Sequence, residues 1–136
     1  MIVVDTNVLA YLHFDTIHSE EAQLVHEIDP EWASPTLWRS EFTNVVSMYL
    51  RMQIINHQSA LDALDFAKQT IGDREYTISV YQVLELVMES SCTSYDCEFV
   101  ALAMDQQTKL ITYDKKILNQ FPSIAITAAD FIKQSR

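Results

Sequence analysis

Residues 1–12 read MIVVDTNVLAYL, an apolar run that is interrupted at Asp5 and then resumes with helical spacing. Ile2 to Val4 predict a short strand buried on both faces of a parallel sheet. Asp5 follows where that strand gives way to a helix. Its carboxylate can cap the helix, or it can line the crevice at the carboxyl end of the strand, where open parallel sheets bind ligands. The choice between these roles depends on which other side chains reach the same edge.

Short β-rich runs alternate with longer segments of helical period along residues 1–136, which indicates one α/β domain with a parallel sheet covered by helices. We expect strands near Ile2 to Val4, Trp32 to Ser34, Tyr76 to Ile78, Leu110 to Thr112 and Ile124 to Ile126. We expect helices from Ser19 to Pro30, Thr36 to Met52, Asn56 to Gly72, Ser79 to Glu89, Ser94 to Gln107, and from Thr127 onward. A chain of this length can bury a core as a single domain.

Composition excludes several classes of function. The formal net charge of −10 argues against binding nucleic acid through a broad basic surface, although cations held at an acidic site can reverse the local sign. Gly72 is the only glycine, which excludes a P-loop and a GxGxxG dinucleotide motif because both need several glycines. No apolar run is long enough to span a membrane, so we expect a soluble, cytoplasmic protein without membrane association.

Cysteine and histidine residues do not form a recognisable metal motif. Cys92 and Cys97 are the only cysteines, and their spacing favours two reduced, buried thiols over a local bridge. The histidines also lack ligand spacing and are expected to be surface or packing residues; they are His13, His18, His26 and His57. A zinc site of the Cys or His type is therefore not expected.

Glu41 is an acid in a place that acids usually avoid. The apolar face of the helix expected from Thr36 to Met52 consists of Leu37, Trp38, Phe42, Val45, Met48, Tyr49 and Met52. Glu41 falls inside this face, one turn from Leu37 and one turn from Val45. A buried carboxylate is usually protonated, paired or bound to a cation. The nearby base Arg39 points about 160° away on the helical wheel, which argues against an ion pair within the helix.

Two further acids extend the pattern. Asp114 follows the apolar run LITY as Asp5 follows IVV, so both carboxylates are expected at the carboxyl ends of strands. Asp96 lies in the first turn of its helix, on the face of Phe99 and Val100. Each acid also has a structural alternative, because Asp114 can cap the next helix and Asp96 can interact favourably with its helix dipole.

If the first and fourth strands are neighbours, these acids share one crevice. Two carboxylates about 5 Å apart repel by about 3 kcal/mol at an effective dielectric of 20, so a group of four needs a counter-charge. Mg²⁺ or Mn²⁺ meets that need, since both prefer oxygen ligands. Such ions activate water and stabilise the leaving oxygen in phosphodiester hydrolysis. The candidate catalytic and metal-binding residues are therefore Asp5, Glu41, Asp96 and Asp114.

Four polar residues are candidates to support this site: Thr6, Asn7, Asn44 and Thr112. The two threonines stand beside acids, where a hydroxyl could bond to a water or a phosphate oxygen. They could equally be an ordinary helix-start residue and an ordinary strand residue. Asn44, three residues after Glu41, is expected beside it on the helix, and Asn7 is a further candidate.

The segments that carry these residues resemble those of PIN domains in their order and approximate spacing. They are VVDTNVLAYL, LWRSEFTNVV, SYDCEFVALAMD, LITYDKKI and ITAADF. The chain is most similar to the bacterial or archaeal toxins of VapBC toxin–antitoxin pairs. The ordered set of four acids is far more specific than the D-T-N opening alone.

The resemblance implies a three-layer α/β/α fold with a five-stranded parallel sheet of strand order 3-2-1-4-5. It implies a Mg²⁺- or Mn²⁺-dependent endoribonuclease that uses the four acids, is assisted by Thr112, and leaves 5′-phosphate and 3′-hydroxyl ends. It also implies a homodimer, and a cognate antitoxin whose tail, often carrying an arginine, enters the acidic pocket.

Three other classes of function remain as alternatives. A non-catalytic PIN module, acting as a scaffold or RNA-binding partner, typically lacks one or more of the acids, and this chain keeps all four. A phospho-acceptor receiver domain needs an acidic pair after the first strand, where Asp5 stands alone. A haloacid-dehalogenase-like phosphatase needs an acid in place of Asn7. Metal binding and RNA cleavage separate the enzyme from these alternatives.

Overall fold

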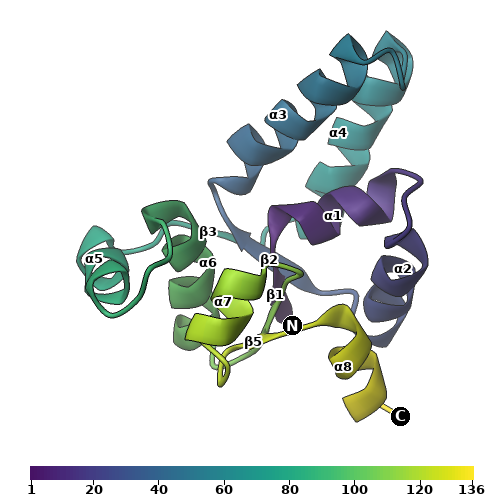
Figure 1. Ribbon diagram of the computed structural model, residues 1–136. Coiled ribbons are helices and arrows are strands. Elements are labelled where there is room, and N and C mark those ends of the chain that lie inside the picture. Colours follow the sequence, from purple (N-terminus) through teal and green to yellow (C-terminus); the bar gives the residue numbers. More distant parts are fainter.

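The computed structural model describes residues 1–136 as a sheet of five strands flanked by helices (Figure 1). The strands are β1 (Ile2–Val4), β2 (Trp32–Pro35), β3 (Glu75–Tyr76), β4 (Leu110–Ile111) and β5 (Ala125–Ile126). The helices are α1 (Thr6–His13), α2 (Ser19–Ile28), α3 (Trp38–Arg51), α4 (His57–Ile71), α5 (Val80–Met88), α6 (Ser94–Asp105), α7 (Lys115–Gln120) and α8 (Ala128–Gln134). None of the helices combines the length and the apolar character needed to cross a membrane.

The sheet confirms the predicted topology. Its strand order is β3-β2-β1-β4-β5, and every neighbouring pair is parallel. Val3 of β1 is in register with Ala33 of β2 on one side and Leu110 of β4 on the other. The pairing with β4 continues through Asp5, whose N–H donates to the Ile111 carbonyl at 3.0 Å. The strand order reverses at β1, so the carboxyl ends of β1 and β4 open onto the crevice where such sheets bind ligands.

Helices cover both faces of the sheet, which gives the three layers seen in Figure 1. Ile2 and Val4 pack with residues of α1, α2, α3, α4 and α8, whereas Val3 packs on the opposite side with α5, α6 and α7. This alternation follows from the two-residue repeat of a strand. Because both faces are buried, β1 is apolar at every position. Cys92 and Cys97 are free thiols, as predicted, and both are buried on the side of the sheet that α5, α6 and α7 cover.

The start of α3 and the extent of β3 differ from the sequence prediction. α3 begins at Trp38 rather than Thr36, because the two residues after Pro35 form a turn before the helix. β3 comprises Glu75 and Tyr76 and does not extend to Ile78, because it pairs only with the last two residues of β2.

Two of the residues at predicted helix starts cap their helices and two do not. Asn56 caps α4 and Thr127 caps α8. α6 is capped by Thr93 rather than Ser94, because the Thr93 hydroxyl accepts from the Asp96 N–H at 3.1 Å. Ser79 precedes α5, but its side chain makes no capping bond.

The apolar face of α3 is narrower than the sequence predicts. Its buried side chains are Trp38, Phe42 and Val46, whereas Met48 and Met52 are 49% and 64% exposed. Figure 1 shows the reason: α3 and α4 lie side by side as an arm whose far end projects beyond the sheet. The start of α3 is the end of the helix that lies nearer the sheet (Figure 1).

His13, the last residue of α1, connects this helix to α4. Its Nε2 lies 3.1 Å from the Thr70 hydroxyl oxygen, and its ring stacks on Phe66 with 6.2 Å between centroids. Burial, with a smaller contribution from His26, lowers the pKa of His13 to about 4. The neutral imidazole is therefore the form that suits the folded protein.

We expect the His13 contact to weaken on acidification. The folded pKa of about 4 lies below the ordinary value of 6.5, so the unfolded chain binds more protons between these values and the stability of the fold falls as the pH drops through this window. In a His13→Gln variant, the loss of unfolding free energy from pH 7 to pH 4 should be smaller by about 1–2 kcal/mol, allowing for the partial exposure of the ring.

Urea denaturation at several pH values measures this difference. His57→Gln, which changes an exposed histidine of α4, is the matched control and should keep the pH slope of the original protein. Equal slopes for His13→Gln and the original protein would contradict the assignment.

Candidate metal centre

Asp5 and Asp114 are linked by Thr112 at the carboxyl ends of β1 and β4. The Thr112 hydroxyl donates to Asp5 Oδ2 (2.8 Å) and accepts from the backbone N–H of Asp114 (3.0 Å). Thr112 itself is completely buried. Asp114 also caps α7, because its Oδ1 accepts from the Ile117 N–H at 3.0 Å. Asp5 makes no side-chain capping bond to α1, so the capping role suits Asp114 and not Asp5.

Glu41, in the first turn of α3, is held toward the same end of β1. The Thr6 hydroxyl donates to Glu41 Oε1 at 2.7 Å. Arg39 turns away, as the helical wheel predicts, and its Nε lies 2.7 Å from Glu75 Oε2. Glu41 is half-buried, and its hydrogen-bond partner is a neutral hydroxyl. The Thr112 and Thr6 hydroxyls therefore position two of the predicted acids, Asp5 and Glu41.

Electrostatic repulsion connects all four acids. Burial raises the pKa of Asp5, and the carboxylates of Asp96 and Asp114 raise it further, against the lowering effect of the Thr112 hydroxyl. Burial also raises the pKa of Glu41, with the Thr6 hydroxyl lowering it and Asp5 and Asp96 raising it. None of the four forms an ion pair with a lysine or arginine. The group is an accumulation of negative charge without a counter-charge of its own.

The chemistry of this donor set fits a divalent cation. Mg²⁺ and Mn²⁺ prefer carboxylate oxygens, and a bound cation would remove the repulsion that raises the pKa values of Asp5 and Glu41. The carboxylates do not form a closed cage, because no three Asp, Glu, His or Cys side chains are placed to hold one ion together. Repulsion separates like charges, so an ion held by three or more of these carboxylates would require the less constrained side chains to move toward Asp5 and Glu41.

A cavity of about 200 Å³ lies in front of Asp5 and Glu41, and we call it the carboxylate pocket; Asp96 and Asp114 do not line it. Its lining residues are Asp5, Thr6, Asn7, Glu41, Asn44 and Val45. The sequence predicts five of these six as site residues. Asn7 and Asn44 are exposed, and the hydrogen bond to Glu41 comes from Thr6, so the asparagines contribute polar walls to the pocket.

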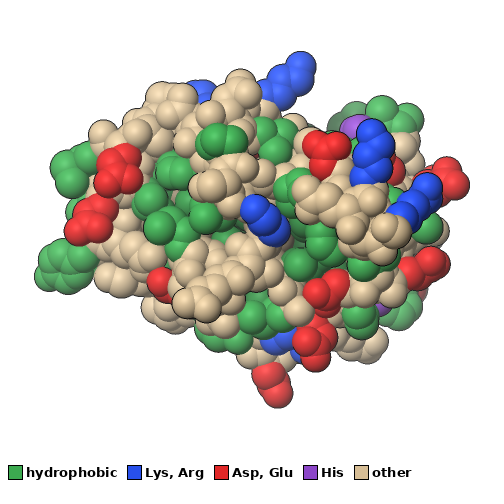
Figure 2. Space-filling model, turned by 90° about the horizontal axis from the view of Figure 1, so that it is seen from below, with side chains coloured by type: hydrophobic (Ala, Val, Ile, Leu, Met, Phe, Trp, Pro, Cys, Tyr) green, Lys and Arg blue, Asp and Glu red, His purple; other side chains and the backbone are tan.

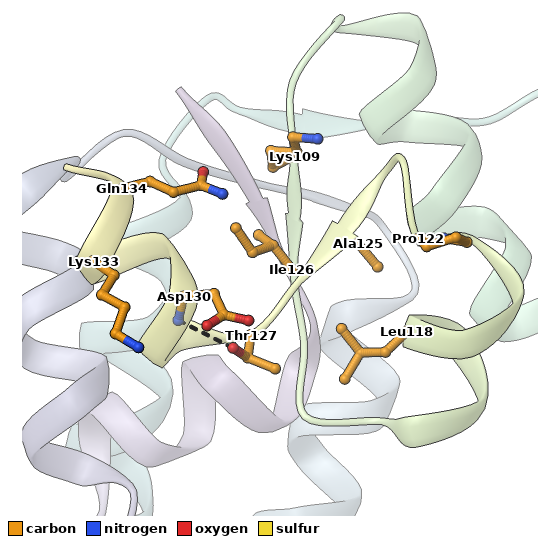
Figure 3. Close-up of a pocket in the computed structure, with 9 residues that line it drawn as sticks. All are labelled: Lys109, Leu118, Pro122, Ala125, Ile126, Thr127, Asp130, Lys133 and Gln134. Atoms are coloured by element: carbon orange, nitrogen blue, oxygen red, sulfur yellow. Dashed lines mark hydrogen bonds between the residues drawn. The ribbon is translucent and has the colours of Figure 1, made fainter.

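A larger cavity, of about 540 Å³, runs along the exposed edge of β5 between α7 and α8 (Figure 3). Its charged lining residues are Lys109, Asp130 and Lys133, and it contains none of the four predicted acids. The backbone N–H of Asp130 donates to the Thr127 hydroxyl, and this bond caps α8. Cavity size alone would favour this groove as the functional site. The raised pKa values of Asp5 and Glu41 favour the smaller pocket, because perturbed pKa values are typical of functional sites.

The face of the molecule drawn in Figure 2 has no concentration of positive charge for binding nucleic acid. Figure 2 views the molecule from below Figure 1, and the lysine and arginine side chains there are scattered among hydrophobic and acidic ones. This distribution agrees with the net charge of −10. A phosphodiester at the carboxylate pocket would need bound cations to offset the negative charge there.

A family model described as PIN domain matches residues 2–122, from β1 to the residues after α7. The chain belongs to the PIN domain family. PIN domains are typically nucleases and are generally dependent on divalent metal ions, which agrees with the acidic centre of this one. No curated protein matches the chain.

Solved structures show the same PIN fold over nearly the whole chain. PAE2754 from Pyrobaculum aerophilum has a TM-score of 0.75 at 19% identity, covering 98% of this chain and 95% of that one. A toxin–antitoxin complex from Klebsiella pneumoniae has a TM-score of 0.70 at 19% identity, covering 94% and 98%. VapBC2 from Rickettsia felis, bound to a DNA fragment from its promoter, has a TM-score of 0.67 at 18% identity, covering 93% and 98%. At these identities the likeness concerns the fold.

Sequence reasoning missed one acid near the site. Glu98 of α6 raises the pKa of Glu41, and burial raises the pKa of Glu98 itself. On the helical wheel Glu98 lies about 200° from Asp96, so the periodicity that identified Asp96 gives no signal for Glu98. The fold brings this carboxylate close to the site by placing the start of α6 near the start of α3.

Proposed function

We propose that this PIN domain is an endoribonuclease that cleaves RNA phosphodiesters with Mg²⁺ or Mn²⁺, as the toxin of a toxin–antitoxin pair. One observation carries the proposal: the Thr112 hydroxyl connects Asp5 and Asp114 at the point where the strand order reverses. Glu41 and Asp96 bring further negative charge to this point. An uncompensated group of oxygen ligands at the crevice of a parallel sheet is suited to a cation and a phosphate ester.

In this proposal Asp5, Glu41, Asp96 and Asp114 hold the metal. When bound, the ion supplies charge neutralisation and a more acidic water. Thr112 keeps Asp5 in position and Thr6 keeps Glu41 in position, so two ligands are oriented before the ion arrives. Asn7 and Asn44 offer amide groups to a water or a phosphate oxygen at the mouth of the pocket.

Metal dependence is the direct test of the proposal. We expect chelation to stop RNA cleavage, added Mn²⁺ to restore it, and calorimetric titration to detect Mn²⁺ binding. Because the pKa values of Asp5 and Glu41 are raised, protons should compete with Mn²⁺ from a higher pH than for free carboxyls, whose pKa values are 3.8 and 4.5. Mn²⁺ affinity should therefore fall as the pH is lowered from neutrality.

The scaffold alternative gives the opposite results. A non-catalytic PIN module would show no Mn²⁺ binding and no metal-dependent cleavage of single-stranded RNA. RNA binding that is unaffected by chelation would favour an RNA-binding module over the enzyme.

We further propose a cognate antitoxin, a homodimer and a cytoplasmic site of action. The likeness to toxin–antitoxin complexes supports the antitoxin partner, and an RNA substrate would place the activity in the cytoplasm. Induced expression of the chain should arrest growth, and co-expression of its antitoxin should relieve the arrest. Light scattering of the purified chain measures the dimer. Growth that continues during expression of the soluble, correctly folded chain would contradict the toxin role.

A further inference from the structure

A second cavity, which we call the Tyr95 pocket, adjoins the carboxylate pocket. It has a volume of about 320 Å³ and is lined by Leu37, Ser40, Glu41, Asn44 and Tyr95. Glu41 and Asn44 line both cavities. A molecule with one group at the carboxylates can therefore extend directly into the Tyr95 pocket.

The aromatic ring in this pocket is free to bind a flat ligand. The side chain of Tyr95 is 59% exposed at the start of α6, next to Asp96. Other rings near the acids are already engaged: Tyr113 packs edge-on with Tyr11 and donates its hydroxyl to Glu21, and Trp38 packs edge-on with Phe42.

The other walls define what kind of flat ligand fits. Leu37 contributes apolar surface, and the exposed side chains of Ser40 and Asn44 present hydrogen-bond donors and acceptors. The pocket contains no lysine or arginine, and Glu41 is its only charged residue. Such a pocket disfavours a phosphate or an acidic peptide and suits a neutral ring with a polar edge.

We propose that the Tyr95 pocket binds one nucleobase of single-stranded RNA, adjacent to the phosphodiester at the carboxylates. The base stacks on the Tyr95 ring, and its polar edge faces Asn44 and Ser40. A base can enter only when it is unpaired, so the pocket selects single strands, loops or bulges over duplex RNA. This proposal rests on the proposed ribonuclease function and adds a determinant of substrate choice.

Steady-state kinetics on mixed-sequence, single-stranded RNA with Mn²⁺ test the stacking. Tyr95→Ala should raise KM about tenfold with little change in kcat, because stacking on an aromatic ring typically changes affinity by this order and stabilises substrate and transition state alike. Tyr95→Phe keeps the ring and should keep KM. Tyr81→Ala removes a ring that is 80% exposed on α5 and lines neither cavity, and it should also keep KM.

Single abasic substitutions along an RNA 12-mer locate the base. For the original protein, one abasic position beside the cleaved bond should raise KM as much as Tyr95→Ala does. The Tyr95→Ala variant should be insensitive to that same substitution, because the interaction is already absent. Calorimetric Mn²⁺ affinity should be equal in all variants.

The outcomes separate this proposal from the function on which it rests. An original protein that neither binds Mn²⁺ nor cleaves RNA would overturn both. Normal cleavage with an unchanged KM for Tyr95→Ala would overturn the base pocket alone. A change in oligomeric state for Tyr95→Ala, measured by light scattering, would also overturn it, because the ring would then belong to a protein interface.

Discussion

Asp5→Asn should lower kcat/KM for RNA cleavage by about 10³-fold or more, because a metal ligand contributes several kcal/mol of transition-state stabilisation. Glu41→Gln should have a similar effect. The threonine bonds can persist in both variants, since the amide oxygen of Asn or Gln can accept from Thr112 or Thr6. The loss would therefore reflect the missing charge and not a collapsed pocket.

The unfolding free energy of these variants should stay constant or rise by up to about 1 kcal/mol without metal. The raised pKa values of Asp5 and Glu41 mean that the charged carboxylates are disfavoured in the folded state. Urea denaturation measures this change. Asp65→Asn, at an exposed position of α4, is the control and should retain activity. Unchanged cleavage by both Asp5→Asn and Glu41→Gln would remove these acids from the catalytic assignment.

Thr112→Val should weaken the site without removing a ligand. The valine has a similar shape but leaves Asp5 without its hydroxyl donor and the Asp114 N–H without its acceptor. At this buried position, losing the two bonds should cost about 2 kcal/mol of unfolding free energy. The affinity for Mn²⁺ should fall about tenfold or more, as is typical when a residue that orients a metal ligand is lost.

Thr112→Ser is the matched control, because it keeps the hydroxyl. Its Mn²⁺ affinity should remain close to that of the original protein, although the lost methyl group should reduce stability by about 1 kcal/mol. Calorimetry and urea denaturation measure the two quantities. Equal Mn²⁺ affinity for the valine and serine variants would show that the hydroxyl does not orient Asp5.

The sheet could be predicted from sequence because its evidence is local. Three consecutive apolar residues before Asp5 identify a strand buried on both faces, and Leu110 and Ile111 begin a similar short run that leads to Asp114. The strand order came from the resemblance to PIN domains, and the structure confirms it. The exposure of Met48 and Met52 was not predictable from helical period, because it depends on where the α3–α4 arm leaves the core.

The position of Glu41 could also be predicted from sequence. Glu41 was identified because an acid among apolar residues needs an explanation, and the structure finds it half-buried and bonded to Thr6. The sequence could not decide which strand-end acid caps a helix, because that choice depends on side-chain rotation and on the position of Thr112. Nor could it identify the Tyr95 pocket, whose walls come from α3 and α6.

The bond between Thr112 and Asp5 joins residues that are 107 positions apart in the chain. During synthesis, the central strand and the arm that carries Glu41 emerge long before β4, so an incomplete chain has only part of its carboxylates in place. Pairing of β4 with β1 is then the step that assembles the centre. Under the proposed function, a nascent chain would therefore hold an incomplete metal centre until β4 and Asp114 have been made and β4 has paired with β1.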